Sequence, residues 1–177
     1  MTETTTPVAS SGQRLLDRIA DISIYIAATA LLGLVVVQGW QVFARYVIND
    51  SPSWTEPVTL LLLSTAMSLG AACGVHTNRH FGFYLLAESM RPALRRVVDT
   101  LVQLVVAVLG GFIAVWAWVL LLDGLSIKTA GAELPQSINY LPLSVGGALM
   151  VIFALNRAWN VHQPAAAAGN ADAEGDR

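Results

Sequence analysis

Residues 100–122 read TLVQLVVAVLGGFIAVWAWVLLL, an apolar run without a charged side chain. A helix needs roughly 20 such residues to cross about 30 Å of hydrocarbon at about 1.5 Å per residue. Three further charge-free runs of spanning length lie at residues 22–44, 57–78 and 134–156. The chain is therefore predicted to be an all-α integral membrane protein with four transmembrane helices.

The composition favours a membrane protein over a soluble one. Hydrophobic residues make up 55% of the chain and charged residues only 12%, whereas about a quarter of a soluble domain is charged. So few charges could not cover a surface that faces water, and membrane lipids are the expected surroundings. The net charge of −2 offers no basic face for nucleic acid, so no nucleic-acid partner is expected.

The polar ends of the chain are expected to lie outside the membrane. We predict a disordered N-terminal tail at residues 1–13, a transmembrane domain at residues 14–162, and a disordered C-terminal tail at residues 163–177. The first helix is expected to begin near Leu16. The predicted spans are about residues 20–44, 54–76, 97–122 and 140–160.

The distribution of arginine and lysine predicts the orientation, because cytoplasmic flanks carry an excess of these residues. The first connection contains only Arg45 and the third only Lys128. The N-terminal flank, the second connection and the C-terminal flank hold the other basic residues near the spans: Arg14, Arg18, Arg79, Arg91, Arg95, Arg96 and Arg157. Both ends of the chain are therefore predicted to be cytoplasmic (N-in/C-in).

The second connection contains a segment that is too short to span the membrane. Residues 79–90 read RHFGFYLLAESM and mix aromatic and aliphatic side chains with charged ones. This pattern favours a short helix at the inner interface, between the second and third spans, with its apolar side in lipid. The alternative is a simple cytoplasmic linker.

Charged side chains avoid the centres of the predicted spans. Arg45, Glu56 and Asp99 all lie at span ends. A self-sufficient proton-coupled exporter needs a carboxylate inside the membrane, so we do not expect this chain to transport a substrate alone, and we predict no catalytic residue. Arg45 and Glu56 flank a short turn and could form an ion pair that closes it; alternatively, both charges are solvated.

The histidines do not form a convincing metal site. His76 and His80 are one helical turn apart, but no cysteine or carboxylate accompanies them at ligand spacing. Haem between transmembrane helices would need histidines on facing spans, and His162 lies beyond the last one. We therefore predict no metal or cofactor bound by this chain, and we interpret these histidines as solvated or as contacts to lipid phosphate.

Small residues predict where helices pack closely. In lipid, small side chains let two helix backbones approach each other, because apolarity alone gives no driving force for association. The sequence leaves open whether the packing is within the chain or onto a partner. The candidate packing residues are Gly70, Gly74, Gly110, Gly111, Gly146 and Gly147.

An ordered set of short motifs resembles a known family. QVFARYV ends the first span at residues 41–47, and SPSWTE at residues 51–56 opens the second. LGAA at residues 69–72 lies near the end of the second span, with His80 beyond it, and YLPL at residues 140–143 opens the last span. Over roughly residues 14–159, the chain resembles the DctQ-type small membrane subunit of tripartite ATP-independent periplasmic (TRAP) transporters.

The resemblance implies an auxiliary role in a bacterial inner membrane. Such subunits cross the membrane four times and pair with a large permease that holds the substrate and sodium sites. A periplasmic solute-binding protein delivers an organic acid, such as a C4-dicarboxylate or a related carboxylate, and a sodium gradient drives uptake. The small subunit would scaffold the large permease and help to dock the binding protein.

The positions that match the family motifs give candidate functional residues. Arg45, Trp54 and Glu56 would act at the outer face and His80 at the inner interface. The resemblance implies structural or docking roles for all of them and a catalytic role for none. The alternatives are a membrane anchor or haem subunit of a respiratory oxidoreductase and a small exporter that works alone.

Overall fold

The computed structural model describes residues 11–50, 52–77, 92–128 and 135–162, and these residues are almost entirely helical. The long helices are α1 (Ser11–Phe43), α2 (Thr55–Thr77), α4 (Pro92–Asp123) and α5 (Leu141–His162). Short helical segments at the connections are η1 (Ala44–Ile48), η2 (Gly124–Ser126) and η3 (Gln136–Asn139). An isolated bridge between Lys128 and Pro135 is the only β-type pairing among the described residues.

The prediction of four membrane-spanning helices is confirmed. The helical stretches long and apolar enough to span are Gly12–Ile48, Thr55–Thr77, Arg96–Ser126 and Gln136–Trp159. The first contains 37 residues, about 55 Å of helix at about 1.5 Å per residue. Because the hydrocarbon layer is only about 30 Å thick, this helix must either tilt or extend beyond the hydrocarbon.

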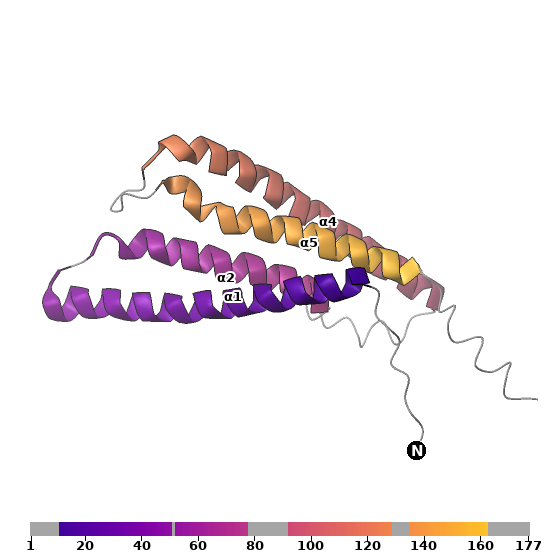
Figure 1. Ribbon diagram of the computed structural model, residues 1–177, viewed down its shortest axis with the longest axis horizontal. Coiled ribbons are helices and arrows are strands. Elements are labelled where there is room, and N and C mark those ends of the chain that lie inside the picture. Colours follow the sequence, from indigo (N-terminus) through magenta and orange to yellow (C-terminus); the bar gives the residue numbers. More distant parts are fainter. Residues whose placement is uncertain (1–10, 51, 78–91, 129–134, 163–177) are drawn as a thin grey trace, which may run out of the picture.

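The helices form two hairpins that lie side by side (Figure 1). α1 packs on α2, α4 packs on α5, and the two central helices α2 and α5 join the hairpins. The order across the molecule is therefore α1, α2, α5, α4, so within the described residues the helices form a row and not a closed bundle. The starts of α1 and α4 and the ends of α2 and α5 lie at one end of the molecule. Following the predicted orientation, we call it the inner end.

α1 begins at Ser11, more than one turn before Leu16, where the first helix was expected to begin. A hydrogen bond from Asn156 joins Gln13, near the start of α1, to α5. At its other end, α1 continues into the π-helix η1, which stops at Asn49 in a left-handed conformation with φ 58°. Asparagine tolerates this conformation better than most residues. The predicted interfacial helix at residues 79–90 lies outside the described residues.

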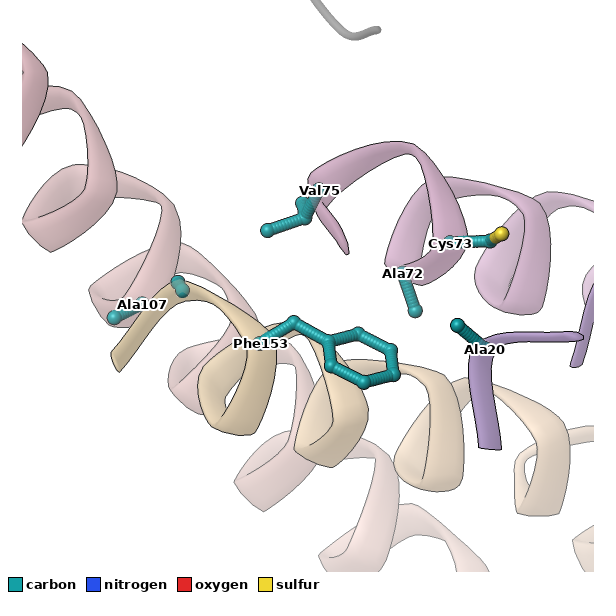
Figure 2. Packing of buried hydrophobic residues seen from close by; sticks show 7 residues of the cluster. Ala20, Ala72, Cys73, Val75, Ala107 and Phe153 are labelled. Carbon is teal, nitrogen blue, oxygen red and sulfur yellow. The ribbon is translucent and has the colours of Figure 1, made fainter. Parts of the chain in front are cut away.

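The core is small and lies toward the inner end. It is built from Ala20, Ala72, Cys73, Val75, Ala107, Phe153 and Ala154. Phe153 is fully buried, and Figure 2 shows its ring extending from α5 toward Ala72 and Ala20. Small side chains on α1 and α2 thus leave room for one large ring, which fills the space between the two hairpins.

Candidate functional site

Arg45, Trp54 and Glu56 lie around the turn between α1 and α2. Arg45 is part of η1, Trp54 precedes α2, and Glu56 lies in the first turn of α2. All three side chains are exposed. Among the described residues, the structure shows no ion pair between Arg45 and Glu56, which favours the alternative of two solvated charges. Glu56 still suits its position, because a carboxylate stabilises the positive end of the helix dipole.

Buried hydroxyl groups shape this turn and join the two hairpins. The Thr55 side chain is fully buried, and its hydroxyl donates a hydrogen bond to the Pro52 carbonyl at 2.8 Å. On the other side of α2, the Ser68 hydroxyl donates to the Pro142 carbonyl at 2.9 Å, and that of Ser64 donates to the Asn139 carbonyl at 3.2 Å. The last two bonds connect α2 to η3 and to the first turn of α5.

The glycines differ sharply in how closely they pack. A β-carbon on Gly146 would lie 2.6 Å from the β-carbon of Ser68, and one on Gly147 would lie 2.8 Å from the Gly110 carbonyl oxygen. A β-carbon on Gly110 would lie 2.9 Å from that of Met150. These glycines allow α5 to approach both α2 and α4 at distances that no larger residue would permit.

Other predicted packing positions are less crowded. A β-carbon on Gly111 would meet Val151 at an ordinary 3.7 Å, and one on Gly70 would meet nothing within 4 Å. Gly74 is half-buried on α2. Packing within the described chain therefore does not need a glycine at position 70, and its use against a partner stays a prediction. His80 lies outside the described residues.

A polar cluster at the inner end was missed by the sequence interpretation. The Asp17 carboxylate accepts a hydrogen bond from Nε2 of His76 at 2.9 Å and one from Gln13 at 3.5 Å. Nδ2 of Asn156 donates to Gln13 at 3.3 Å, and Nη1 of Arg157 donates to the His76 carbonyl at 3.0 Å. We use the name polar cluster for these five residues, which come from α1, α2 and α5.

The interpretation of His76 as a solvated histidine is therefore wrong. Its side chain is only 14% exposed, and its ring lies 4.8 Å from that of Phe153. No signal in the sequence indicated this pair, because Asp17 and His76 are 59 positions apart and lie at unequal distances from the turn of the first hairpin.

The outer faces of the row are broad and apolar. Every exposed residue of α4 between positions 101 and 122 is apolar, and Phe112 and Val115 are each more than 60% exposed. On α1 the exposed face includes Tyr25 and Leu32, but it also carries the amide of Gln38. Faces of this kind require lipid or another membrane protein as neighbours.

Comparison with protein families identifies the chain. The model of the family described as "Tripartite ATP-independent periplasmic transporters, DctQ component" matches residues 34–163. The chain belongs to the DctQ family. This DctQ chain is therefore a multi-pass membrane component of a tripartite transporter, as the motifs predicted, and the family is one of transporter components and not of enzymes. A comparison with curated proteins gives no match.

The match covers the candidate docking residues and also bears on the alternative function. Arg45, Trp54, Glu56 and His80 all lie within the matched part of DctQ, whereas Gln13 and Asp17 of the polar cluster precede it. The match does not favour a respiratory anchor. In the described part of DctQ, no group of three or more histidine, cysteine, aspartate or glutamate side chains could hold a metal ion. That the chain binds no cofactor stays a prediction.

Proposed function

We propose that this DctQ protein is the non-catalytic scaffold of a sodium-driven transporter that imports organic acids, C4-dicarboxylates or related carboxylates, across a bacterial inner membrane. The observation that carries the proposal is the family match over residues 34–163. The absence of charged residues from the centres of the spans supports it, because the substrate and sodium sites would then lie on a large permease partner.

The exposed Gln38 supports α1 as the helix that meets the permease. Its side-chain amide makes no hydrogen bond within the described part of the chain, and Trp40, Val42 and Phe43 are exposed between it and the outer end of α1. Hydrogen bonds between helices stabilise association in membranes by about 1 kcal/mol. The exposed face of α4 carries no side-chain amide across residues 101–122, and its polar atoms there are the indole N–H groups of Trp116 and Trp118; lipid alone would suit it.

The exposed side chains around the turn between α1 and α2 support docking of the solute-binding protein. Arg45, Trp54 and Glu56 combine both charge signs with an aromatic surface in one short region. Interfaces are enriched in tryptophan and arginine. We assign these residues to docking, and we assign His80 to contacts at the inner interface.

Photocrosslinking in native membranes tests the scaffold assignment. A photoreactive residue is placed at Leu32 on α1 or, as a matched control, at Phe112 on α4; both side chains are more than 60% exposed. We expect Leu32 to give a crosslinked product that mass spectrometry identifies as a large multi-span permease, and Phe112 to give none. A permease crosslinked to Phe112 alone would contradict the use of α1, and no permease at either position would contradict the scaffold function.

Transport assays test the rest of the proposal. Cells that lack the small subunit should lose sodium-dependent uptake of the organic acid, and plasmid-borne wild-type protein should restore it. Uptake that persists without a sodium gradient, or without the small subunit, would contradict the proposed function.

A further inference from the structure

Polar contacts and close backbone approach join the two hairpins in two separate regions, with the apolar core around Phe153 between them. One lies at mid-span, where Gly146 meets Ser68 and the hydroxyl of Ser68 donates to the Pro142 carbonyl. The other is the polar cluster, which begins eight residues further along α2 at His76, about 12 Å away at about 1.5 Å per residue. The Ser64 bond belongs to the mid-span region, because it is only one turn from Ser68.

Two helices that touch at one crossing point can rotate about it. Within the described residues, α1 has few contacts with the second hairpin, and the bond between Gln13 and Asn156 joins it directly to α5. Lipid does not oppose such a rotation, because apolar side chains are as well solvated by lipid tails as by each other. A second attachment at a distance from the crossing point is what can hold the angle between the hairpins.

His76 is suited to provide this second attachment. From α2 it contacts two other helices: its Nε2 bonds to Asp17 of α1 in its own hairpin, its ring contacts Phe153, and its carbonyl accepts from Arg157. The last two partners belong to α5. The bond to Asp17 orients the imidazole, and the oriented ring in turn contacts the buried phenyl ring.

We propose that the polar cluster is a clamp that holds the two hairpins at a defined angle at the inner end, with the Asp17–His76 contact as its central element. Without it, only the apolar packing around Phe153 joins the hairpins toward the inner end, so the hairpins pivot about the crossing of Ser68 and Gly146 and the inner end loosens while the mid-span contact persists. This proposal concerns the isolated chain and does not depend on the proposed transport function.

Pulsed electron paramagnetic resonance on the full chain in lipid nanodiscs tests the clamp. Spin labels are attached in a Cys73→Ala background at exposed positions of the two outer helices. The inner pair is Arg18→Cys with Arg96→Cys, and the mid-span pair is Leu31→Cys with Phe112→Cys. In the parent protein, we expect a narrow distance distribution for both pairs.

If the polar cluster is a clamp, its removal should change the distance distribution of the inner label pair only. Asp17→Ala should widen the inner-pair distribution about twofold, as expected for local loosening, and leave the mid-span pair unchanged. Asp21→Ala removes an exposed carboxylate one turn away on the same helix and should change neither pair. Asp17→Asn keeps the side-chain shape and covers the case in which Asp17→Ala does not fold; we expect it to widen the inner pair less.

A double variant separates the clamp from general destabilisation. If Asp17 and His76 act as one unit, Asp17→Ala combined with His76→Ala should widen the inner pair no more than His76→Ala alone. Equal widening of the inner and mid-span pairs, an unchanged inner pair in Asp17→Ala, or additive effects in the double variant would each overturn the proposal.

Discussion

Replacing Gly146 by alanine tests whether close approach of α2 and α5 stabilises the fold. The new β-carbon would lie 2.6 Å from the Ser68 β-carbon and 2.8 Å from the Ser68 carbonyl carbon. Because the second of these atoms belongs to the backbone, rotation of a side chain cannot relieve the overlap. The two helices must separate, and the 2.9 Å hydrogen bond from Ser68 to Pro142 must lengthen with them.

The magnitude follows from three terms. Overpacking in a tight contact costs about 1–3 kcal/mol, and loss of an interhelical hydrogen bond in a membrane costs about 1 kcal/mol. Alanine gains about 1 kcal/mol over glycine in helix propensity. We therefore expect Gly146→Ala to lower the free energy of unfolding by about 1–3 kcal/mol.

Gly70→Ala is the matched control. It makes the same chemical change in a spanning helix, but its β-carbon would meet nothing within 4 Å, so only the propensity gain of about 1 kcal/mol remains. Both variants are unfolded in mixed lipid–detergent micelles by increasing fractions of sodium dodecyl sulfate, with helix content followed by circular dichroism. If Gly146→Ala proves as stable as Gly70→Ala, the α2–α5 contact does not stabilise the fold as argued.

Three further predictions concern other regions. Glu56→Arg should reduce organic-acid uptake at normal membrane abundance, because it reverses an exposed charge at the proposed docking surface; Asp50→Arg is the control, and unchanged uptake in Glu56→Arg would contradict the docking role. Asn49 has a φ of 58°, so Asn49→Gly should keep stability in the unfolding assay and Asn49→Ala should lose about 1 kcal/mol; equal stability of the two would show that backbone strain does not matter there. Gln103 is 9% exposed, and its Oε1 has no hydrogen-bond partner among the described residues. Gln103→Leu should therefore stabilise the protein by about 1 kcal/mol, and a loss of stability in the same assay would point to a partner for that oxygen.

Much of the fold could be predicted because the charge or polarity of a single residue indicates whether it lies in lipid or in water. A charged side chain is costly in lipid, so charge-free runs mark the spans wherever they occur in the chain. The turn between α1 and α2 was equally accessible, since Pro52 and its polar neighbours favour turns. The outer-face candidates Arg45, Trp54 and Glu56 came from matched motifs, and the structure adds that all three are exposed.

The polar cluster and the unequal glycines could not be predicted in the same way. Asp17 and His76 are 59 positions apart, and nothing local to either residue indicates the other. Gly70 and Gly146 look alike in sequence, yet only Gly146 faces a neighbouring helix. Which face of an apolar helix meets another helix depends on the rotation of both, and a helix that is apolar all round carries little sequence signal of that rotation.

The row of helices has a physical consequence for the proposed scaffold function. In lipid, the broad apolar faces of α1 and α4 contribute no net force toward α2 and α5, so the row must be held by contacts that lipid cannot replace. Those contacts are the glycine approaches at Gly146 and Gly147, the hydroxyl bonds of α2, and the polar cluster. All of them involve the two central helices, which leaves the outer helices available for lipid and for a partner. A closed bundle of the same length would bury part of those outer faces and present less surface to the proposed permease partner.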